Sequence, residues 1–221
     1  MIARMFTGIV AAIGRIETVE PLAADAQAGV RLGIHAGGLP LADVALGDSI
    51  AIQGACMTVV AKNDTHFDVD VSRESLSKTV GLDRPGEVNL EKALRLADHI
   101  GGHLVSGHVD GLGTVSHFAP VGESYELRVR TSPELGRYFA YKGSVVVNGV
   151  SLTVNSVRDD ATGCEFSINL IPHTLAVTTL KHLAVGGQVN LEIDLIARYV
   201  ERMLTHTATG LPAAARPLAA V

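Results

Sequence analysis

An internal duplication that spans most of the chain constrains the fold more than any other feature of the sequence. Residues 54–59 (GACMTV) resemble residues 149–154 (GVSLTV), which lie 95 positions later. Residues 88–91 (VNLE) are answered 101 positions later by residues 189–192 (VNLE). Such a period is much longer than the roughly 20 to 50 residues of a solenoid repeat. The sequence therefore predicts two similar domains that differ by small loop insertions.

Two further segment pairs support the duplication, one at the start of each half and one inside it. Residues 7–10 (TGIV) correspond to residues 106–109 (SGHV), and residues 67–76 correspond to residues 166–175, both at an offset of 99. At 221 residues, the chain has room for two domains of about 100 residues, each large enough to bury a core.

Composition and charge favour a soluble protein that binds small molecules or copies of itself. The chain has 18 basic and 23 acidic residues and no basic cluster, so no nucleic-acid partner is expected. Two cysteines, Cys56 and Cys164, are too few for a disulfide framework. Because a signal peptide and a long apolar run are both missing, we expect no membrane partner and a cytoplasmic location.

Short strands predominate in the predicted secondary structure. Runs rich in β-branched residues alternate with glycine or polar breaks, without the long crossover helices that a parallel sheet requires. An all-β fold, an antiparallel barrel or sandwich in each half, is therefore expected. The predicted strands are residues 8–16, 29–35, 48–60, 66–71 and 86–90 in the first half, and residues 107–115, 124–131, 143–157, 164–170 and 187–193 in the second.

Helices are expected only at the joints. Ser132, Pro133 and Glu134 form an N-terminal capping signal for a short helix, whose partner in the first half would lie near residues 37–44. Residues 91–100 carry a weak apolar face and end at two glycines, which predicts a linking helix and a domain boundary there. The predicted units are residues 1–102 and 103–194 as two domains, residues 195–204 as a helix, and residues 205–221 as a flexible tail.

The predicted terminal helix has no counterpart in the first half. Its apolar stripe follows helical spacing, with charged residues opposite. Two explanations remain open: the stripe mediates self-association, or it packs against its own domain. The stripe consists of Ile196, Tyr199, Val200, Met203 and Leu204.

Cys56 and Ser151 occupy the same place in the two copies. A single cysteine among apolar neighbours is commonly a buried small hydrophobe rather than a nucleophile. However, both copies have a nucleophilic or polar residue here, followed two positions later by Thr58 or Thr153. Strand alternation places each such pair on one face, so each domain offers one candidate site.

The histidines do not predict a metal centre. His99, His103, His108 and His117 cluster in the sequence, but their spacing matches no compact ligand pair, so no metal is expected. His108 differs because it follows a glycine that allows close approach of a ligand, and Ile9 stands at its place in the first copy. A titrating group in one site and an isoleucine in the other would make the sites chemically unequal.

Several of these segments together resemble the riboflavin synthase family, alpha-chain type. They are residues 5–10 (MFTGIV), 54–58 (GACMT), 101–111 (GGHLVSGHVDG), 148–153 (NGVSLT) and 170–174 (LIPHT), and the resemblance covers about residues 5–204. It implies two tandem six-stranded Greek-key barrels and a C-terminal helix that mediates a homotrimer. The implied reaction is dismutation of two 6,7-dimethyl-8-ribityllumazine molecules to riboflavin and a 5-amino-6-ribitylamino-pyrimidinedione. It requires neither cofactor nor metal.

The resemblance also implies the site residues, which would lie between the first barrel of one subunit and the second barrel of a neighbour. The catalytic candidates are Cys56, His108, Ser151 and Thr153, with Phe6 nearby. The first-domain contacts are Gly8, Ile9, Val10, Cys56, Met57, Thr58, Asp70, Val71, Ser72, Arg73, Glu74 and Ser75. The second-domain contacts are Gly107, His108, Val109, Lys142, Ser151, Leu152, Thr153, Asn169, Leu170, Ile171, Pro172, His173 and Thr174.

The chain departs from the family pattern at three places, and a second function is compatible with the resemblance. His173 replaces the usual glutamate, Met57 stands where leucine is common, and residues 1–4 precede the usual first methionine. Relatives with the same two barrels serve as lumazine or flavin carriers, so a non-catalytic carrier is the alternative. The resemblance also leaves open an association with a lumazine synthase.

Overall fold

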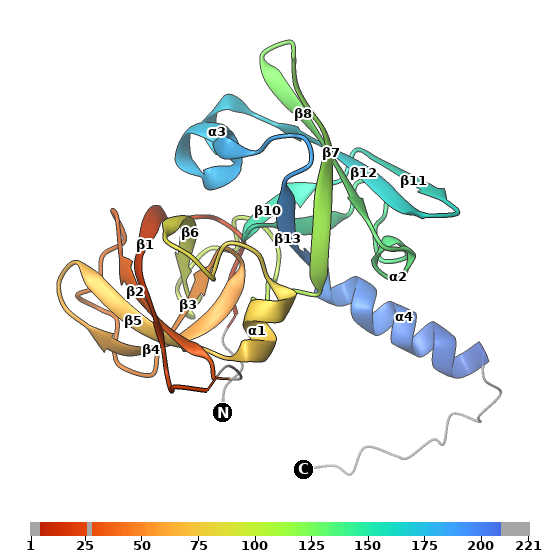
Figure 1. The fold of residues 1–221 in the computed structure, drawn as a ribbon. Coiled ribbons are helices and arrows are strands. Elements are labelled where there is room, and N and C mark those ends of the chain that lie inside the picture. Colours follow the sequence, from red (N-terminus) through yellow and green to blue (C-terminus); the bar gives the residue numbers. More distant parts are fainter. Residues whose placement is uncertain (1–4, 26–27, 209–221) are drawn as a thin grey trace.

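The computed structural model describes residues 5–25 and 28–208 (Figure 1). The N-terminal extension, residues 1–4, and residues 209–221 of the predicted tail lie outside the described residues. Two β-rich halves lie side by side, and a long helix extends away from the second half. The predicted all-β architecture with a terminal helix is confirmed.

The first half is a closed six-stranded antiparallel barrel with the strand order β1-β2-β5-β4-β3-β6. Side chains alternate between the core and the surface along its strands: in β5, Phe67, Val69 and Val71 are buried, while Asp70 is exposed. A short helix that was not predicted, α1 (Arg73–Lys78), follows β5. The strands are β1 (Ala12–Pro21), β2 (Val30–His35), β3 (Ser49–Ile52), β4 (Ala55–Lys62), β5 (His66–Val71) and β6 (Gly86–Lys92).

The second half forms a seven-stranded sheet with the order β10-β9-β13-β7-β8-β12-β11. The strands are β7 (Gly111–Val121), β8 (Ser124–Thr131), β9 (Ser144–Val147), β10 (Val150–Thr153), β11 (Ser156–Asp160), β12 (Gly163–Leu170) and β13 (Gln188–Ile193). Its helical elements are α2 (Pro133–Gly136), α3 (Pro172–Val177) and the 3₁₀ helix η1 (Thr179–His182). Only α2 of these was predicted.

One interrupted strand accounts for the difference between the halves. Strands β10 and β11 together occupy the place of β4, and they are separated by Val154 and Asn155. Val154 corresponds to Val59, where the pairing of β4 with β5 shifts register. The pairings β1 with β2 and β7 with β8 also share a bulge, after Ile16 and Val115, which are 99 positions apart. The duplicated barrel thus bends at β4 in one copy and breaks there in the other.

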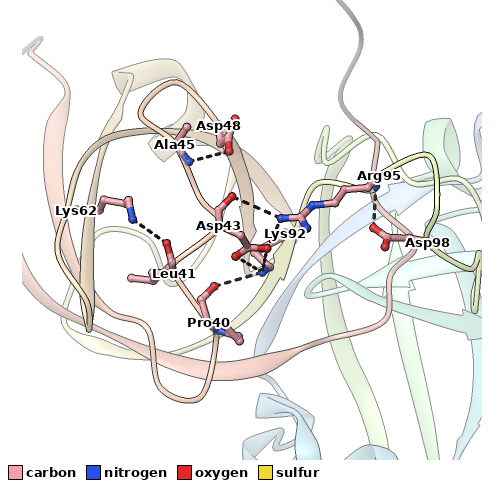
Figure 2. A network of polar contacts seen from close by, with 9 residues as sticks. All are labelled: Pro40, Leu41, Asp43, Ala45, Asp48, Lys62, Lys92, Arg95 and Asp98. Carbon is pink, nitrogen blue, oxygen red and sulfur yellow. Dashed lines mark hydrogen bonds and ion pairs between the residues drawn. The ribbon is translucent and has the colours of Figure 1, made fainter.

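The helix predicted over residues 37–44 is absent, because turns form there instead (Figure 2). Gly37 adopts a positive φ of 60°. Lys62 donates to the carbonyl of Leu41 at 2.7 Å, and Lys92 donates to the carboxylate of Asp43 at 2.8 and 3.0 Å. Carbonyl and side-chain contacts with the neighbouring strands therefore hold this loop.

The helix predicted over residues 91–100 is also absent. Glu91 and Lys92 continue β6, and the backbone then turns where the amide of Arg95 donates to the Asp98 carboxylate at 2.8 Å. The guanidinium of Arg95 contacts Asp43, and the hydrogen bond from Lys92 lowers the pKa of the Asp43 carboxyl to about 2 (Figure 2). These ion pairs hold the linker against the first barrel, where the weak apolar face could not specify a helix.

The two barrels meet at their repeated glycines. A methyl group added to Gly54 would lie 2.8 Å from the amide nitrogen of Gly149, and one added to Gly149 would lie 2.9 Å from that of Gly54. Both glycines have positive φ, 89° and 83°. Only glycine allows this backbone conformation and this approach together.

Repeated asparagines connect the barrels around that contact. The amide group of Asn89 donates to the carbonyl of Asn148 at 2.8 Å, and that of Asn190 donates to the carbonyl of Gln53 at 3.0 Å. Both asparagines are buried. The repeated segment VNLE thus supplies matching cross-links, and the duplication produces a near-twofold interface.

The terminal helix, α4 (Leu195–Ala208), begins at its predicted position and continues four residues beyond the predicted end. Arg198 donates to Asp110 at 2.6 Å and Arg137 pairs with Glu201 at 3.1 Å, which anchors one side of the helix. The apolar stripe lies elsewhere, with Ile196 70% exposed and Leu204 66% exposed. Packing of the stripe against its own domain is therefore wrong for this chain.

No helix in the described part of the chain is long and apolar enough to cross a membrane.

We expect Gly54→Ala to weaken the barrel interface. Gly47 has a similar φ of 85°, but a methyl group added there meets no described atom within 4 Å, so Gly47→Ala is a matched control for backbone strain. Strain costs each variant about 1–2 kcal/mol, and the clash with Gly149 should cost Gly54→Ala about 1–3 kcal/mol more. Urea unfolding measures both values. Equal losses would contradict a tight contact between the barrels.

Candidate active site

Two segments, residues 7–10 and residues 106–109, each lie against the opposite barrel and are called the crossing segments. The first reaches Ser151 and the second reaches Cys56. The amide of Cys56, on β4, donates to the carbonyl of Gly107 at 2.8 Å. The amide of Ser151, on β10, donates to the carbonyl of Gly8 at 2.7 Å. A methyl group added to Gly8 would lie 2.6 Å from Cβ of Ser151, and one added to Gly107 would lie 2.7 Å from Cβ of Cys56. The crossing segments therefore require glycine at these positions.

This exchange corrects the grouping that the sequence suggests. The resemblance places Gly8, Ile9 and Val10 with the first-domain residues, but in the structure this segment lies against Ser151 of the second barrel. Likewise, the segment that contains His108 lies against Cys56 of the first barrel. The grouping fails because each segment leaves its own barrel before the first strand begins.

Buried carboxylates hold both crossing segments. Glu91 accepts hydrogen bonds from the amide and hydroxyl of Thr7, each at 2.7 Å, and from the amide of Gly8 at 2.9 Å. Glu192 accepts from the amide and hydroxyl of Ser106, each at 2.7 Å. Burial raises the pKa of both carboxyl groups, although the donors of Thr7 and Ser106 oppose this effect. The sequence contained a signal for this structural role, because both copies of the repeated segment VNLE end in glutamate.

Phe6 lies beneath the crossing rather than in a cavity. It pairs with Val105 through backbone hydrogen bonds of 2.7 and 3.0 Å, and its side chain has no exposed surface. A methyl group added to Gly107 would lie 2.9 Å from the Phe6 ring. In this structure Phe6 supports the segment that leads to His108 and offers no surface to a ligand.

Cys56 and His108 line one cavity of about 190 Å³ between β4, α1 and the crossing segment. Cys56 is half-buried and His108 is exposed. Glu74 and Ser75 come from α1, whose first turn is fixed because the Ser72 hydroxyl accepts from the amide of Ser75 at 3.1 Å. The cavity lining contains seven of the predicted contact residues: Cys56, Met57, Glu74, Ser75, Gly107, His108 and Val109.

Other residues predicted for the first-domain site have different surroundings. Asp70 forms a two-pronged ion pair with Arg31 at 2.8 and 2.9 Å, which lowers the pKa of its carboxyl. Val71 points into the barrel core. Thr58 and Arg73 are exposed and do not line the cavity. Thr58 nevertheless shares the outward face of β4 with Cys56, as alternation predicts.

The second-domain residues surround Ser151 without an equally defined hollow. Ser151 and Leu152 are half-buried, Ile9 is exposed, and Val10 packs against the second barrel core. Thr153, Asn169, Ile171, Pro172 and His173 are exposed; Thr174 is half-buried and Leu170 is buried. Lys142 is also exposed, with its amine 3.1 Å from the side-chain oxygen of Asn155. Helix α3 of the second half corresponds to α1 of the first half. Its N-cap residue, Ile171, lacks the hydroxyl that Ser72 supplies at the N-cap of α1.

The sequence analysis considered His103 only as one member of a histidine cluster and not as a residue of either candidate site. Its Nδ1 lies 2.7 Å from the Ser151 hydroxyl oxygen, so the second site has a histidine of its own. One indirect signal was available: His103 lies three residues before the crossing segment of the second half begins.

A cavity larger than the one at Cys56, about 410 Å³, lies elsewhere between the barrels. Its lining includes Gln53, Arg84 and Asn148, together with Glu87 and His182, whose side chains lie 2.8 Å apart. None of the predicted site residues lines it, so size alone does not identify the site. Within residues 5–25 and 28–208, no group of three or more His, Cys, Asp and Glu side chains is arranged to hold a metal ion.

Comparison with known proteins now gives the family. The model of the lumazine binding domain matches residues 7–93 and residues 106–194, one match for each half. The riboflavin synthase of Photobacterium phosphoreum is 42% identical over 202 residues, which cover 90% of this chain and 89% of that protein. The riboflavin synthase of Mycobacterium tuberculosis (strain H37Rv) is 41% identical over 203 residues, which cover 90% of this chain and 98% of that protein. The chain belongs to the riboflavin synthase family.

Solved structures agree with this fold. LumP complexed with 6,7-dimethyl-8-(1'-D-ribityl) lumazine has a TM-score of 0.70 and 23% identity, with 85% of this chain and 98% of that chain covered. LumP complexed with riboflavin has a TM-score of 0.72 and 25% identity, with 86% and 99% covered. The paired barrels are thus a shared architecture, and the function has to be argued from the site.

Glu91→Gln should reveal the buried carboxylate through pH dependence. Because burial raises the folded-state pKa of Glu91, its contribution to stability is complete below the usual value of 4.5 and declines as pH rises through the raised pKa. The variant cannot titrate and loses an acceptor, so we expect it to be about 1–3 kcal/mol less stable than wild type at pH 4. This difference should shrink by pH 7.5.

Glu126→Gln is the control for this measurement. Arg128 lowers the pKa of the Glu126 carboxyl, so the contribution of Glu126 is present above the usual pKa and disappears as pH falls through the lowered value. Urea unfolding between pH 4 and 7.5 measures both variants. A Glu91→Gln difference that grows with pH would show that the raised pKa is incorrect.

Proposed function

We propose that the chain is a riboflavin synthase. It converts two molecules of 6,7-dimethyl-8-ribityllumazine into riboflavin and a 5-amino-6-ribitylamino-pyrimidinedione by transfer of a four-carbon unit. The observation that carries this proposal is the reciprocal crossing at Cys56 and Ser151, which gives one chain two related but chemically unequal sites. The membership of the chain in the riboflavin synthase family supports the same reaction.

Unequal sites suit a reaction between two identical molecules. A dismutation needs one molecule as donor and the other as acceptor, so the two binding sites must treat the same ligand differently. Here a thiol and an exposed histidine share one cavity, whereas Ser151 lies against Gly8 and His103. We assign the duplicated frame to recognition of the common ligand and the differing residues to the separate roles.

The chemistry requires alignment and proton movement more than strong activation. The 7-methyl protons of the lumazine are acidic because the carbanion delocalises into the ring, so a positioned acid or base is sufficient. We assign Cys56, His108, Ser151 and Thr153 to this work. Cys56 acts either by adding to the acceptor ring or by polarising a bound water, while the reduced thiol that both routes use fits a cytoplasmic location.

Partner copies complete the site in this proposal. A cavity of about 190 Å³ is smaller than the roughly 300–1,000 Å³ of ordinary ligand pockets. The exposed stripe on α4 is an apolar surface that a second copy would cover. We therefore propose a homotrimer in which the first barrel of one chain faces the second barrel of its neighbour.

Turnover tests the proposed function directly. We expect the purified protein to convert the lumazine to riboflavin, and the absorbance of riboflavin measures this conversion. Cys56→Ala and His108→Ala should each lower kcat about 100-fold or more, because each removes a positioned nucleophilic or acid–base group. Lumazine affinity, measured by fluorescence, should persist. His117→Ala is the control, since His117 lies on β7 outside this cavity.

Tight lumazine binding without turnover by the wild-type protein would replace the enzyme with a carrier. Unchanged turnover in both Cys56→Ala and His108→Ala would remove their catalytic assignment.

Truncation after Asp194 should reduce both the mass of the assembly and its activity. Met203→Glu should weaken association for the same reason, since it places a charge in the exposed apolar stripe. Arg202→Glu also introduces a carboxylate on α4 but lies outside the stripe, so it should remain assembled. Light scattering at several protein concentrations measures the mass. A truncated chain that remains trimeric would refute the role of the helix.

A further inference from the structure

Before the second barrel, the backbone is fixed directly over Ser151. The amide of His103 donates to the carbonyl of Thr7 at 3.2 Å. A methyl group added to Gly102 would lie 2.2 Å from the Thr7 carbonyl oxygen and 2.7 Å from Cβ of Ser151. This close packing fixes the backbone beside Ser151, and Nδ1 of His103 lies 2.7 Å from the Ser151 hydroxyl oxygen.

The two nitrogens of this imidazole have different surroundings. Nδ1 contacts the Ser151 hydroxyl, whereas Nε2 is buried and has no hydrogen-bond partner among the described residues. A buried polar atom without a partner costs about 1–3 kcal/mol. An apolar side chain in this place would avoid the cost at Nε2. The contact between Nδ1 and the Ser151 hydroxyl therefore calls for a functional explanation.

The ring is suited to remain neutral. Burial lowers the pKa of His103, and the negative charge of Asp194 opposes this effect without reversing it. A neutral imidazole has one nitrogen that accepts and one that donates. If Nδ1 accepts, the hydrogen of the Ser151 hydroxyl points toward His103, and the oxygen lone pairs face away from it.

We propose that His103 is a positioning residue for the Ser151 site, where its Nδ1 accepts the hydroxyl hydrogen and makes Ser151 a hydrogen-bond acceptor for the ligand. Ser151 then receives a donor group of the ligand, a ring N–H or a ribityl hydroxyl in a lumazine. The inference rests on the proposed function for the identity of that ligand. By the 99-residue offset, the position that answers His103 is Arg4, which lies outside the described residues.

Substitutions at His103 distinguish positioning from packing. The amide of asparagine reaches the position of Nδ1, whereas that of glutamine reaches toward Nε2. We expect His103→Asn to keep kcat/KM within about twofold of wild type, and His103→Gln and His103→Ala to lower it about fivefold to tenfold, the value of one hydrogen bond. His99→Ala, an exposed position in the same linker, is the control.

A double-mutant cycle tests whether the effect acts through Ser151. In the Ser151→Ala background, His103→Ala should change kcat/KM by less than about twofold, because the hydroxyl that it orients is already gone. Thermal unfolding confirms that each variant is folded. Equal losses in His103→Asn and His103→Gln would overturn the proposal, as would a full loss from His103→Ala in the Ser151→Ala background.

Nitrogen-15 spectra of the histidine rings test the same contact without turnover. We expect His103 to carry its proton on Nε2, and Ser151→Ala to shift the Nδ1 resonance and leave Nε2 nearly unchanged. A proton on Nδ1, or an Nδ1 resonance that ignores the Ser151→Ala change, would overturn the proposal. Absence of turnover by the wild-type protein would instead defeat the proposed function, and the spectra would still decide the role of His103.

Discussion

The reciprocal crossing of the two glycine segments is the constraint on which the rest of the structure depends. Each segment leaves its own barrel, and a buried glutamate, Glu91 or Glu192, accepts its amide and hydroxyl donors. These donors offset part of the cost of burying each carboxylate, although Oε2 of Glu192 has no hydrogen-bond partner among the described residues. The crossing therefore locks the barrels together and sets Cys56 and Ser151 beside backbone from the opposite half.

Chemical inequality develops on this nearly symmetric frame. The backbone contacts at Cys56 and Ser151 agree within 0.1 Å, 2.8 against 2.7 Å, so the two copies present equivalent strands to equivalent glycines. The side chains differ: a thiol shares its cavity with His108, and a hydroxyl contacts His103. In the proposed function, this frame recognises the same ligand twice, and the differing side chains give the two copies different roles.

Alternation and capping predicted most of the fold, and the failures have physical causes. The predicted strand over residues 124–131 coincides with β8, because its buried and exposed residues alternate clearly. Residues 91–100 had only a weak apolar face, and the ion pairs of Arg95 and Lys92 with Asp43 determine their path. The interruption between β10 and β11 was not predicted, since residues 143–157 read as one continuous β-rich run.

The sequence by itself determined the duplication, the all-β class and the terminal amphipathic helix, and it supplied the residue types of the candidate site. It could not assign each crossing segment to a barrel, because a segment has the same local pattern whether it packs on its own half or on the other. Only the tertiary structure decided that His108 lies with Cys56 and that His103 reaches Ser151. Those pairings depend on long-range backbone hydrogen bonds and on glycine contacts between residues about 50 to 140 positions apart, which no local periodicity encodes.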